Sequence, residues 1–229
     1  MARARLTRCA NNVRQLGLGL QQFVSDNHFY PLSVDGELDG SNRTTNFSTW
    51  AEAVEHHVGG ANTRSAPSFI GRGVWLCPGV RSKGTLGDGF SSYGYNAFGI
   101  GVSSNFSLGV GGHYGFTHTI QPGDPPVVKP AVLVSEVLSP SEMMAIGDGF
   151  HGTGADLYSG QDLLWRHHSY TGFLDATPAK ARHLAKASVV FCDGHVESPT
   201  LKSLFEDTTD DALVRWNRDH LPHREMLQP

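Results

Sequence analysis

The chain opens with the stretch ARARLTRCANNVRQLGLGLQQFVSDN, residues 2–27, and this stretch decides the fold. Its apolar residues recur mostly at steps of three and four, at Leu6, Cys9, Val13, Leu16, Leu20, Phe23 and Val24. Because this spacing places side chains on one face of an α-helix, the sequence predicts a helix from about Ala2 to Asp26 with a single apolar stripe. Asp26, Asn27 and Pro31 are residues that end helices.

Gly17 and Gly19 lie inside this predicted helix. A glycine within a helix costs about 1 kcal/mol relative to alanine unless a close contact requires it. We therefore expect a sheet or a loop to approach the helix at these two positions.

The beginning of the helix carries no capping Ser, Thr, Asp or Asn, and it contains the basic residues Arg3, Arg5 and Arg8. We expect the helix to continue a longer one whose apolar first half precedes this sequence, with the arginines as the collar that flanks a membrane. The alternative is a solvated helix end. The sequence itself holds no window of 18 apolar residues and no signal peptide.

Length and composition predict one loop-rich domain of 229 residues, with 39% hydrophobic residues, 17% charged residues and 27 glycines. Residues 1–27 would supply the helix, and residues 28–229 a globular head that forms one domain with it. The net charge is −4, and no run of Lys or Arg follows residue 8. We therefore expect no nucleic-acid partner.

Further elements follow from local patterns. Residues 28–48 are rich in turn-forming residues and are expected to form a loop. A short helix is predicted from Thr49 to Val58 with Thr49 as its N-cap. The remaining predicted elements are strands at Val74–Leu76, Val127–Val134 and Met143–Asp148, and helical pieces at Leu201–Phe205 and Asp210–Trp216.

The clearest strand signal is Ala187–Cys192, which Asp193-Gly194 follows. These two residues predict a two-residue type I′ hairpin turn, with His195-Val196-Glu197 returning antiparallel. In this arrangement Val189 and Phe191 would face the helix, and Ser188 and Val190 the other side of the sheet. His183 would fold back over the hairpin and bond a loop carbonyl or Asp193.

The chain has three cysteines, an odd number. If the compartment is oxidising, one internal pair at most can form. We expect Cys9 with Cys77, because this disulfide would tie the helix to the first loop region. The alternative is three reduced, mostly buried thiols, with Cys192 among them.

A metal site is suggested by two predicted strands that end in Asp-Gly followed closely by His. The candidate ligands are Asp148, His183, Asp193 and His195. A hard cation such as calcium would accept carboxylates and backbone carbonyls there. The alternative is that Asp-Gly serves only as turn chemistry.

No motif for catalysis or phosphate binding is present: Gly-x-Ser-x-Gly, His-Glu-x-x-His and Cys-x-x-Cys are all absent. The adjacent histidine pairs His56-His57 and His167-His168 lack the i, i+4 spacing of a helical zinc site and are expected to be surface residues. We therefore expect no enzyme activity and no cofactor other than a possible calcium ion.

Several stretches together resemble one family. They are ARARLTRCANNVRQLGLGL (2–20), Trp75-Leu76-Cys77-Pro78, Ser92-Tyr93-Gly94-Tyr95-Asn96, Arg182-His183 with nine residues before Asp193-Gly194, and the tail Trp216-Asn217-Arg218-Asp219-His220. In this order they resemble the type IV pilin-like, pseudopilin-like proteins of planctomycetes and verrucomicrobia, whose sequences carry a prepilin cleavage and methylation segment. The apolar segment that such proteins need for membrane residence and polymerisation is missing from this sequence.

The resemblance implies an α+β fold with a long N-terminal helix packed on an antiparallel sheet of about four strands. It also implies a structural subunit of a type II secretion or type IV pilus-like system, held in the inner membrane with its head in the periplasm or at the cell surface. Its partners would be other pilin-like subunits that pack through the helix, with Leu6, Cys9, Val13, Leu16 and Leu20 as the helix assembly face. Loop calcium is a property of the major pseudopilins.

Two other functions stay open. One is a secreted or surface module that binds a glycan or a protein through the aromatic, Gly-rich loops of residues 90–118. The other is a metal-dependent hydrolase that uses Asp148, His183, Asp193 and His195. An exposed aromatic platform would favour the first, and an open metal site in a cleft the second.

Overall fold

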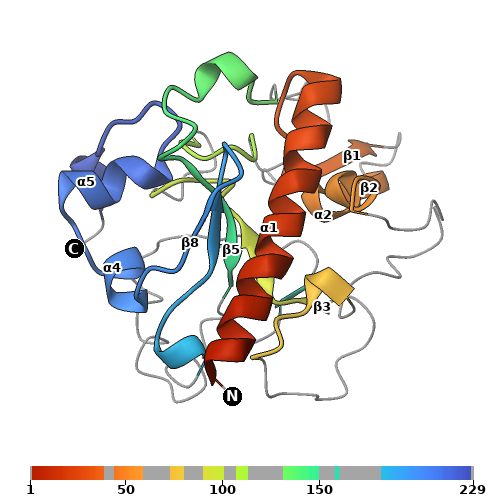
Figure 1. The fold of residues 1–229 in the computed structure, drawn as a ribbon. Coiled ribbons are helices and arrows are strands. Elements are labelled where there is room, and N and C mark those ends of the chain that lie inside the picture. Colours follow the sequence, from red (N-terminus) through yellow and green to blue (C-terminus); the bar gives the residue numbers. More distant parts are fainter. Residues whose placement is uncertain are drawn as a thin grey trace.

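The fold is known from a computed structural model, which describes residues 2–38, 44–58, 73–79, 90–100, 107–112, 131–149, 158–159 and 182–227. Its centre is a helix that lies along a small sheet (Figure 1). The sheet has the strand order β4 (Tyr93–Tyr95), β5 (Met144–Asp148), β7 (Val189–Phe191) and β8 (Val196–Glu197), and every neighbouring pair is antiparallel. The predicted α+β class is confirmed.

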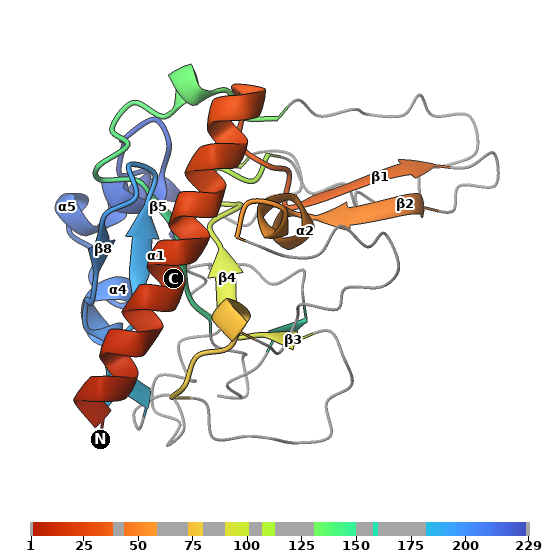
Figure 2. The same ribbon diagram turned by 45° about the vertical axis from the view of Figure 1, so that its right-hand side comes forward.

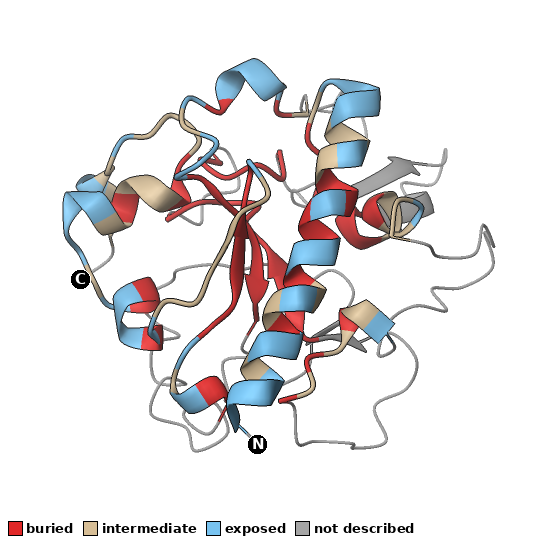
Figure 3. Cartoon of the chain, in the orientation of Figure 1, coloured by how far each residue is buried: buried red, intermediate tan, exposed pale blue. Residues whose placement is uncertain are grey.

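Helix α1 runs without interruption from Ala2 to Asn27, as the apolar spacing predicts. Cys9, Val13, Leu16 and Leu20 are buried, and Leu6 is half-buried. The buried and exposed sides of α1 are separate along its length (Figure 3). The apolar stripe is thus occupied by the chain's own core.

Both glycines of α1 mark close contacts, which confirms the prediction made from their positions. A β-carbon on Gly17 would lie 2.4 Å from Cγ2 of Val190 in β7, and one on Gly19 would lie 2.6 Å from Cγ1 of Val58. Contacts this short leave no room for a side chain. Gly17 therefore allows the helix to lie directly on the sheet, and Gly19 allows it to approach the segment that carries Val54 and Val58.

The central strand β7 is buried on both faces, and here the predicted facing is wrong. Val190 belongs to the core under α1, whereas Val189 and Phe191 belong to a second core. The second core is closed by α4 (Leu201–Phe205) and α5 (Asp210–Leu213). An all-apolar strand has no polar side to distinguish its faces, so alternation alone could not determine which face meets the helix.

The turn between β7 and β8 also differs from the predicted type I′ turn. The Gly194 amide donates to the Phe191 carbonyl at 2.9 Å, and the Phe191 amide donates to the His195 carbonyl at 3.0 Å. Of the three loop residues, Cys192, Asp193 and Gly194, only Gly194 has a positive φ, of +89°. This is the three-residue loop in which a type I turn is followed by a left-handed glycine.

The region after α1 forms a ribbon instead of the predicted loop. β1 (Val34–Leu38) pairs with β2 (Thr44–Thr49) in an antiparallel ribbon that projects from the side of the molecule (Figure 2). α2 (Trp50–Glu55) follows at once, and Thr49 is its N-cap in a capping box with Glu52, as predicted for Thr49.

The other elements are short. η1 (Gly73–Trp75) is a 3₁₀ turn where a strand was predicted. Three apolar residues are too few to show the periodicity of a strand, and the ring of Trp75 packs against that of Trp50 with 5.6 Å between centroids. Most of the strand predicted at 127–134 lies outside the described residues, and Val134 begins a 3₁₀ turn instead. The rest are η2 (Val134–Glu136), η4 (Arg182–Leu184), η5 (Val214–Trp216), η6 (Arg224–Met226) and the paired strands β3 (Phe90–Ser91) and β6 (Tyr158–Ser159). The predicted helical pieces near the C-terminus are confirmed by α4, α5 and η5.

Candidate functional site

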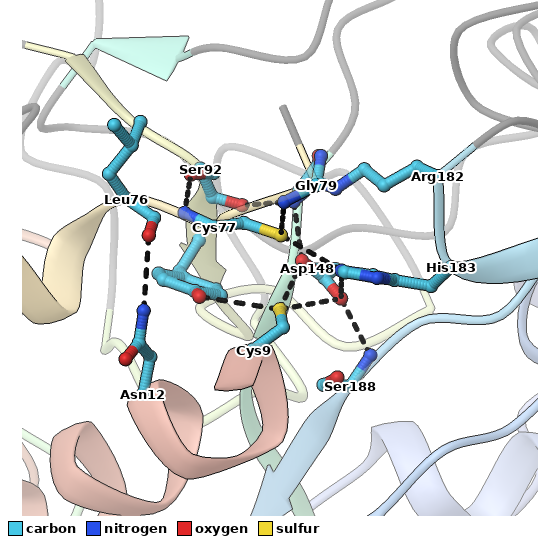
Figure 4. A network of polar contacts seen from close by, with 12 residues as sticks. Cys9, Asn12, Leu76, Cys77, Gly79, Ser92, Asp148, Arg182, His183 and Ser188 are labelled. Atoms are coloured by element: carbon cyan, nitrogen blue, oxygen red, sulfur yellow. Dashed lines mark hydrogen bonds and ion pairs between the residues drawn. The ribbon is translucent and has the colours of Figure 1, made fainter. Parts of the chain in front are cut away.

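Four side chains with metal-binding or acid–base chemistry meet between α1 and one end of the sheet (Figure 4). They are Cys9 of α1, Cys77 just after η1, Asp148 at the end of β5 and His183 in η4. One donor atom from each lies within 4.8 Å of the others, and all four residues are buried. We call them the Cys–Asp–His cluster.

Cys77 is held in place by hydrogen bonds around it. The side chain of Asn12 on α1 donates to the Leu76 carbonyl at 3.1 Å, which joins this segment to the helix. The Cys77 amide donates to Oγ of Ser92 at 2.6 Å. The Gly79 amide donates to Sγ of Cys77 at 3.3 Å, so the sulfur already accepts a backbone hydrogen bond.

The four donor atoms contact one another in pairs. Sγ of Cys77 lies 2.8 Å from Nε2 of His183. Sγ of Cys9 lies 3.2 Å and 3.4 Å from the two carboxylate oxygens of Asp148. Nε2 of His183 is 3.7 Å from Oδ2 of Asp148, and the Tyr93 hydroxyl is 3.3 Å from Sγ of Cys9.

Arg182 supplies the positive charge of the site. Its guanidinium donates to Asp148 and to the carbonyls of Gly149 and Ser92, the latter two at 2.9 Å and 3.0 Å. The Ser188 amide donates to the second carboxylate oxygen of Asp148 at 2.7 Å. A buried carboxylate is costly unless it is paired and hydrogen-bonded, and here both conditions are met.

The backbone that carries His183 is unusual. His183, Leu184 and Ala185 have φ values of +52°, +58° and +59°. Residues with side chains rarely adopt this left-handed region, and each costs on the order of 1 to 3 kcal/mol when the surrounding structure enforces it. Such strain concentrates at functional sites, and here it directs the imidazole of His183 to the cluster.

The two thiols of the cluster differ in acidity. Burial raises the pKa of the Cys9 thiol, and the neighbouring Cys77 and Asp148 raise it further. Burial acts in the same direction on Cys77, but its hydrogen bonds with Cys9 and His183 and the charge of Arg182 outweigh burial and lower its pKa to about 5. The cluster therefore favours a thiolate at Cys77 and a thiol at Cys9.

The sequence placed Asp148, His183, Asp193 and His195 in one metal site, and the structure brings only Asp148 and His183 together. Asp193 and His195 lie in the exposed β7–β8 hairpin, where Oδ1 of Asp193 is 2.6 Å from Nδ1 of His195. The His195 ring stacks on Phe191 with 4.3 Å between ring centroids. His183 does not cover this hairpin, because its left-handed backbone turns it towards Cys77 instead.

The two cysteines of the predicted disulfide also belong to the Cys–Asp–His cluster. All three cysteines carry free thiols, so the predicted Cys9–Cys77 disulfide is not formed, but both residues are members of the cluster. Cys192 is buried elsewhere and hydrogen-bonds with Tyr30. Two separate predictions, a disulfide and a metal site, thus converge on one set of side chains. Cys9, Cys77 and His183 do lie in stretches that carry the resemblance, but no local sequence pattern joins them to one another.

The other stretches that carry the resemblance have structural roles in the described residues. Asn96, which is fully buried, donates to the carbonyls of Met144 and Trp216, both at 2.9 Å, and so joins the sheet to the C-terminal region. Two residues of the tail bond the chain after Asn96. The Ile100 amide donates to the side chain of Asn217 at 3.2 Å, and the guanidinium of Arg218 donates to the Gly109 carbonyl at 3.0 Å.

The aromatic residues proposed as a binding platform are buried where the structure describes them. Tyr93 and Tyr95 are fully buried, and Phe98 is nearly so. Phe106, Tyr114 and Phe116 lie outside the described residues, as does the pair His167-His168. Of the pair His56-His57, His56 is exposed and His57 half-buried, close to Asp26.

Comparison with known proteins gives no family: the chain matches no protein-family model, no curated protein and no solved structure. Among the described residues, no helix is both long enough and apolar enough to cross a membrane.

Proposed function

We propose that the chain is a structural, pilin-like subunit that assembles with other subunits through α1. The single observation that carries the proposal is α1 itself: one unbroken helix from Ala2 to Asn27, laid along a four-stranded antiparallel sheet. This is the arrangement that the resemblance to pseudopilin-like proteins implies. The head domain would then face the periplasm or the cell surface.

The remaining geometry favours a scaffold over its two rivals. The Cys–Asp–His cluster is buried, so its groups have no exposed surface on which a substrate could bind. Tyr93, Tyr95 and Phe98 belong to the core, whereas a binding platform needs its aromatic residues at the surface. Both observations support a domain whose polar clusters maintain its shape.

The surface of α1 that remains for assembly is the side opposite the sheet. It is polar and basic near Arg3, Arg5 and Arg8, and it exposes Leu18, 57% of whose surface is accessible. Helices of neighbouring subunits would pack along this side. This places the contact on a different face from the stripe that the sequence indicated.

The test is cross-linking between copies in a bacterium that expresses the natural gene. A photoreactive amino acid at Leu18 should give a ladder of cross-linked oligomers in the membrane fraction. The same amino acid at Leu221, which is 54% exposed and follows Trp216 of the second core, on the face of the sheet away from α1, serves as the matched control and should give little or no ladder. Deletion of the host's prepilin peptidase should increase the mass of the subunit and abolish the ladder.

Two results would overturn the proposal. One is a monomer that gives no cross-link from any exposed position of α1. The other is a protein whose mass and assembly do not change when the peptidase is removed.

A further inference from the structure

We propose that Cys9, Cys77, Asp148 and His183 form a structural zinc site that fastens α1 to the sheet. This inference does not depend on the proposed function. It concerns how the domain is held together, whatever the domain does.

The donor set is the one that zinc prefers. Zinc in structural sites takes four ligands, mainly thiolate sulfur and imidazole nitrogen, in a tetrahedron. The cluster offers two sulfurs, one imidazole nitrogen and one carboxylate oxygen. Calcium needs six to eight oxygen ligands, so this set does not suit the calcium ion considered from the sequence.

The spacing is close to that of a zinc tetrahedron. Zinc–ligand bonds of about 2.0 to 2.3 Å place the ligands about 3.3 to 3.8 Å from one another. The Cys9–Asp148 and His183–Asp148 contacts, at 3.2 Å and 3.7 Å, lie in or next to this range. The Cys77–His183 contact, at 2.8 Å, would have to open by about 0.7 Å, because a sulfur and a nitrogen on tetrahedral zinc lie about 3.5 Å apart.

The charges balance. Two thiolates and one carboxylate carry three negative charges, which Zn²⁺ and the buried guanidinium of Arg182 together neutralise. Without an ion, ionised thiolates in this place would be uncompensated in a region of low polarity. Because Arg182 already balances Asp148, a divalent cation is what balances two thiolates in this place.

The surroundings of the ligands are those of a prepared site. The Gly79 amide bonds Sγ of Cys77, and the Ser188 amide and Arg182 fix the carboxylate of Asp148. Such outer hydrogen bonds orient the ligands of metal sites. The left-handed backbone at His183 is a second, independent feature, because it maintains a strained conformation that places Nε2 among the other donors.

The ligands come from four separate parts of the chain. Cys9 lies on the first helix, and 174 positions separate it from His183. All four ligand positions are filled by protein and buried, which is typical of structural rather than catalytic zinc. The ion would therefore contribute to folding by joining α1, the segment after η1, β5 and η4.

The rival is a disulfide between Cys9 and Cys77, which would use the same two sulfurs and exclude zinc. In the structure each sulfur is engaged with a different partner, Cys9 with Asp148 and Cys77 with His183. A disulfide would leave the imidazole of the buried His183 without its sulfur partner. Zinc gives every one of the four side chains a ligand role.

The experiment uses the chain without a histidine tag, purified with reductant and then dialysed against equimolar ZnCl₂. Elemental analysis and native mass spectrometry should find one zinc per chain. Alkylation should then modify neither Cys9 nor Cys77 until a chelator is added. Substitution with Co²⁺ should give the absorption of a tetrahedral ion with a thiolate charge-transfer band.

Variants identify the ligands. We expect each of three substitutions, Cys9→Ser, Cys77→Ser and His183→Gln, to weaken zinc binding by more than about 100-fold. Loss of an outer hydrogen bond to a metal ligand weakens binding by only about 10- to 100-fold. Cys192→Ser is the matched control: this cysteine is buried like the others but lies outside the cluster, so zinc content should not change.

Each result obtained with the unmodified chain either supports or overturns the zinc site. One zinc with protected thiols supports the site, and its loss in the cluster variants but not in Cys192→Ser assigns the ligands. A disulfide overturns it: protein purified without reductant would have a mass lower by two hydrogens, and its peptide map would show Cys9 joined to Cys77. The same protein would take up no zinc after reduction. Free, reactive thiols at Cys9 and Cys77 in the presence of equimolar zinc also overturn it.

Discussion

The imidazole ring of His183 lies directly against the backbone of Gly79. A β-carbon on Gly79 would be 2.8 Å from Cε1 of His183 and 3.3 Å from both ring nitrogens. Gly79 does not have a positive φ, so its backbone would accept a side chain and only the ring prevents one. The residue two places after Cys77 is thus glycine because His183 has to reach the cysteine.

We expect Gly79→Ala to lower the free energy of unfolding by about 1 to 3 kcal/mol, since overpacking forces the His183 ring from its place. The measurement is urea unfolding with a chelator present, so that no metal contributes. In a His183→Ala background the same substitution should cost much less, because the clash is gone. An equal cost in both backgrounds would contradict the contact.

Gly73→Ala provides the control for this pair. Gly73 has a φ of +55° and nothing within 4 Å of the position that a β-carbon would take. Its substitution should cost stability through backbone strain alone. His183→Ala should leave that cost unchanged.

The buried pair of Asp148 and Arg182 gives a second prediction. We expect Asp148→Asn to lower the free energy of unfolding by about 3 to 5 kcal/mol, because it leaves the guanidinium charge buried without its counter-charge. Arg182→Gln should cost a similar amount. The double variant should cost clearly less than the two together, since it leaves neither charge unpaired.

The exposed pair of Arg215 and Glu197 is the matched control. Nη2 of Arg215 lies 2.6 Å from Oε2 of Glu197, but the two side chains are 29% and 41% exposed. Glu197→Gln should therefore cost no more than about 1 kcal/mol. A cost like that of Asp148→Asn would show that burial is not what makes the cluster pair important.

The sequence predicted where the helix and the strands lie better than it predicted which of their faces meet. The stripe of α1 has a polar side, so its period identifies the buried face, and Gly17 and Gly19 identify where the helix meets its neighbours. The strand at Val189–Phe191 is buried on both faces and has no polar side, so the residue that meets α1 could not be read from alternation.

The cluster was predictable only in halves. Asp148 and His183 were proposed as metal ligands, and Cys9 and Cys77 as a pair, but nothing local in the sequence joins the two sets. The link is the left-handed turn at His183, Leu184 and Ala185, which no turn-forming residue announces. Asp193 and His195 were proposed only because Asp-Gly followed within two residues by His occurs at two predicted strand ends, and their true setting is a hairpin turn.

The contact between Gly17 and Val190 gives a third prediction. Alanine at residue 17 gains about 1 kcal/mol in helix propensity, but it places a methyl group against a stiff, buried valine. We expect a net loss of about 1 to 2 kcal/mol in the free energy of unfolding for Gly17→Ala. In a Val190→Ala background the same change should be neutral or stabilising. Greater stability of the Gly17→Ala single variant would mean that helix and sheet do not touch there.

His223 lies between two carboxylates near the C-terminus. Its Nε2 is 2.7 Å from Oδ2 of Asp219, and its Nδ1 is 3.1 Å from Oε1 of Glu225. Burial on its own lowers the pKa of His223, but the hydrogen bonds and charges of Asp219 and Glu225 outweigh it and raise that pKa above the ordinary value of 6.5. The protonated ring therefore binds this region together.

This shift sets the sign of a pH dependence. A histidine whose pKa is raised by folding contributes stability that is complete below its unfolded pKa of 6.5 and is lost as the pH rises through its folded pKa. We expect the melting temperature of the parent to exceed that of His223→Gln at about pH 5.5 and the difference to shrink by about pH 8.5. The exposed His56, changed to Gln, is the control for the loss of a histidine side chain. A difference for His223→Gln that grows towards high pH would show that the ring is held as a neutral group, and the two carboxylates would then not stabilise it.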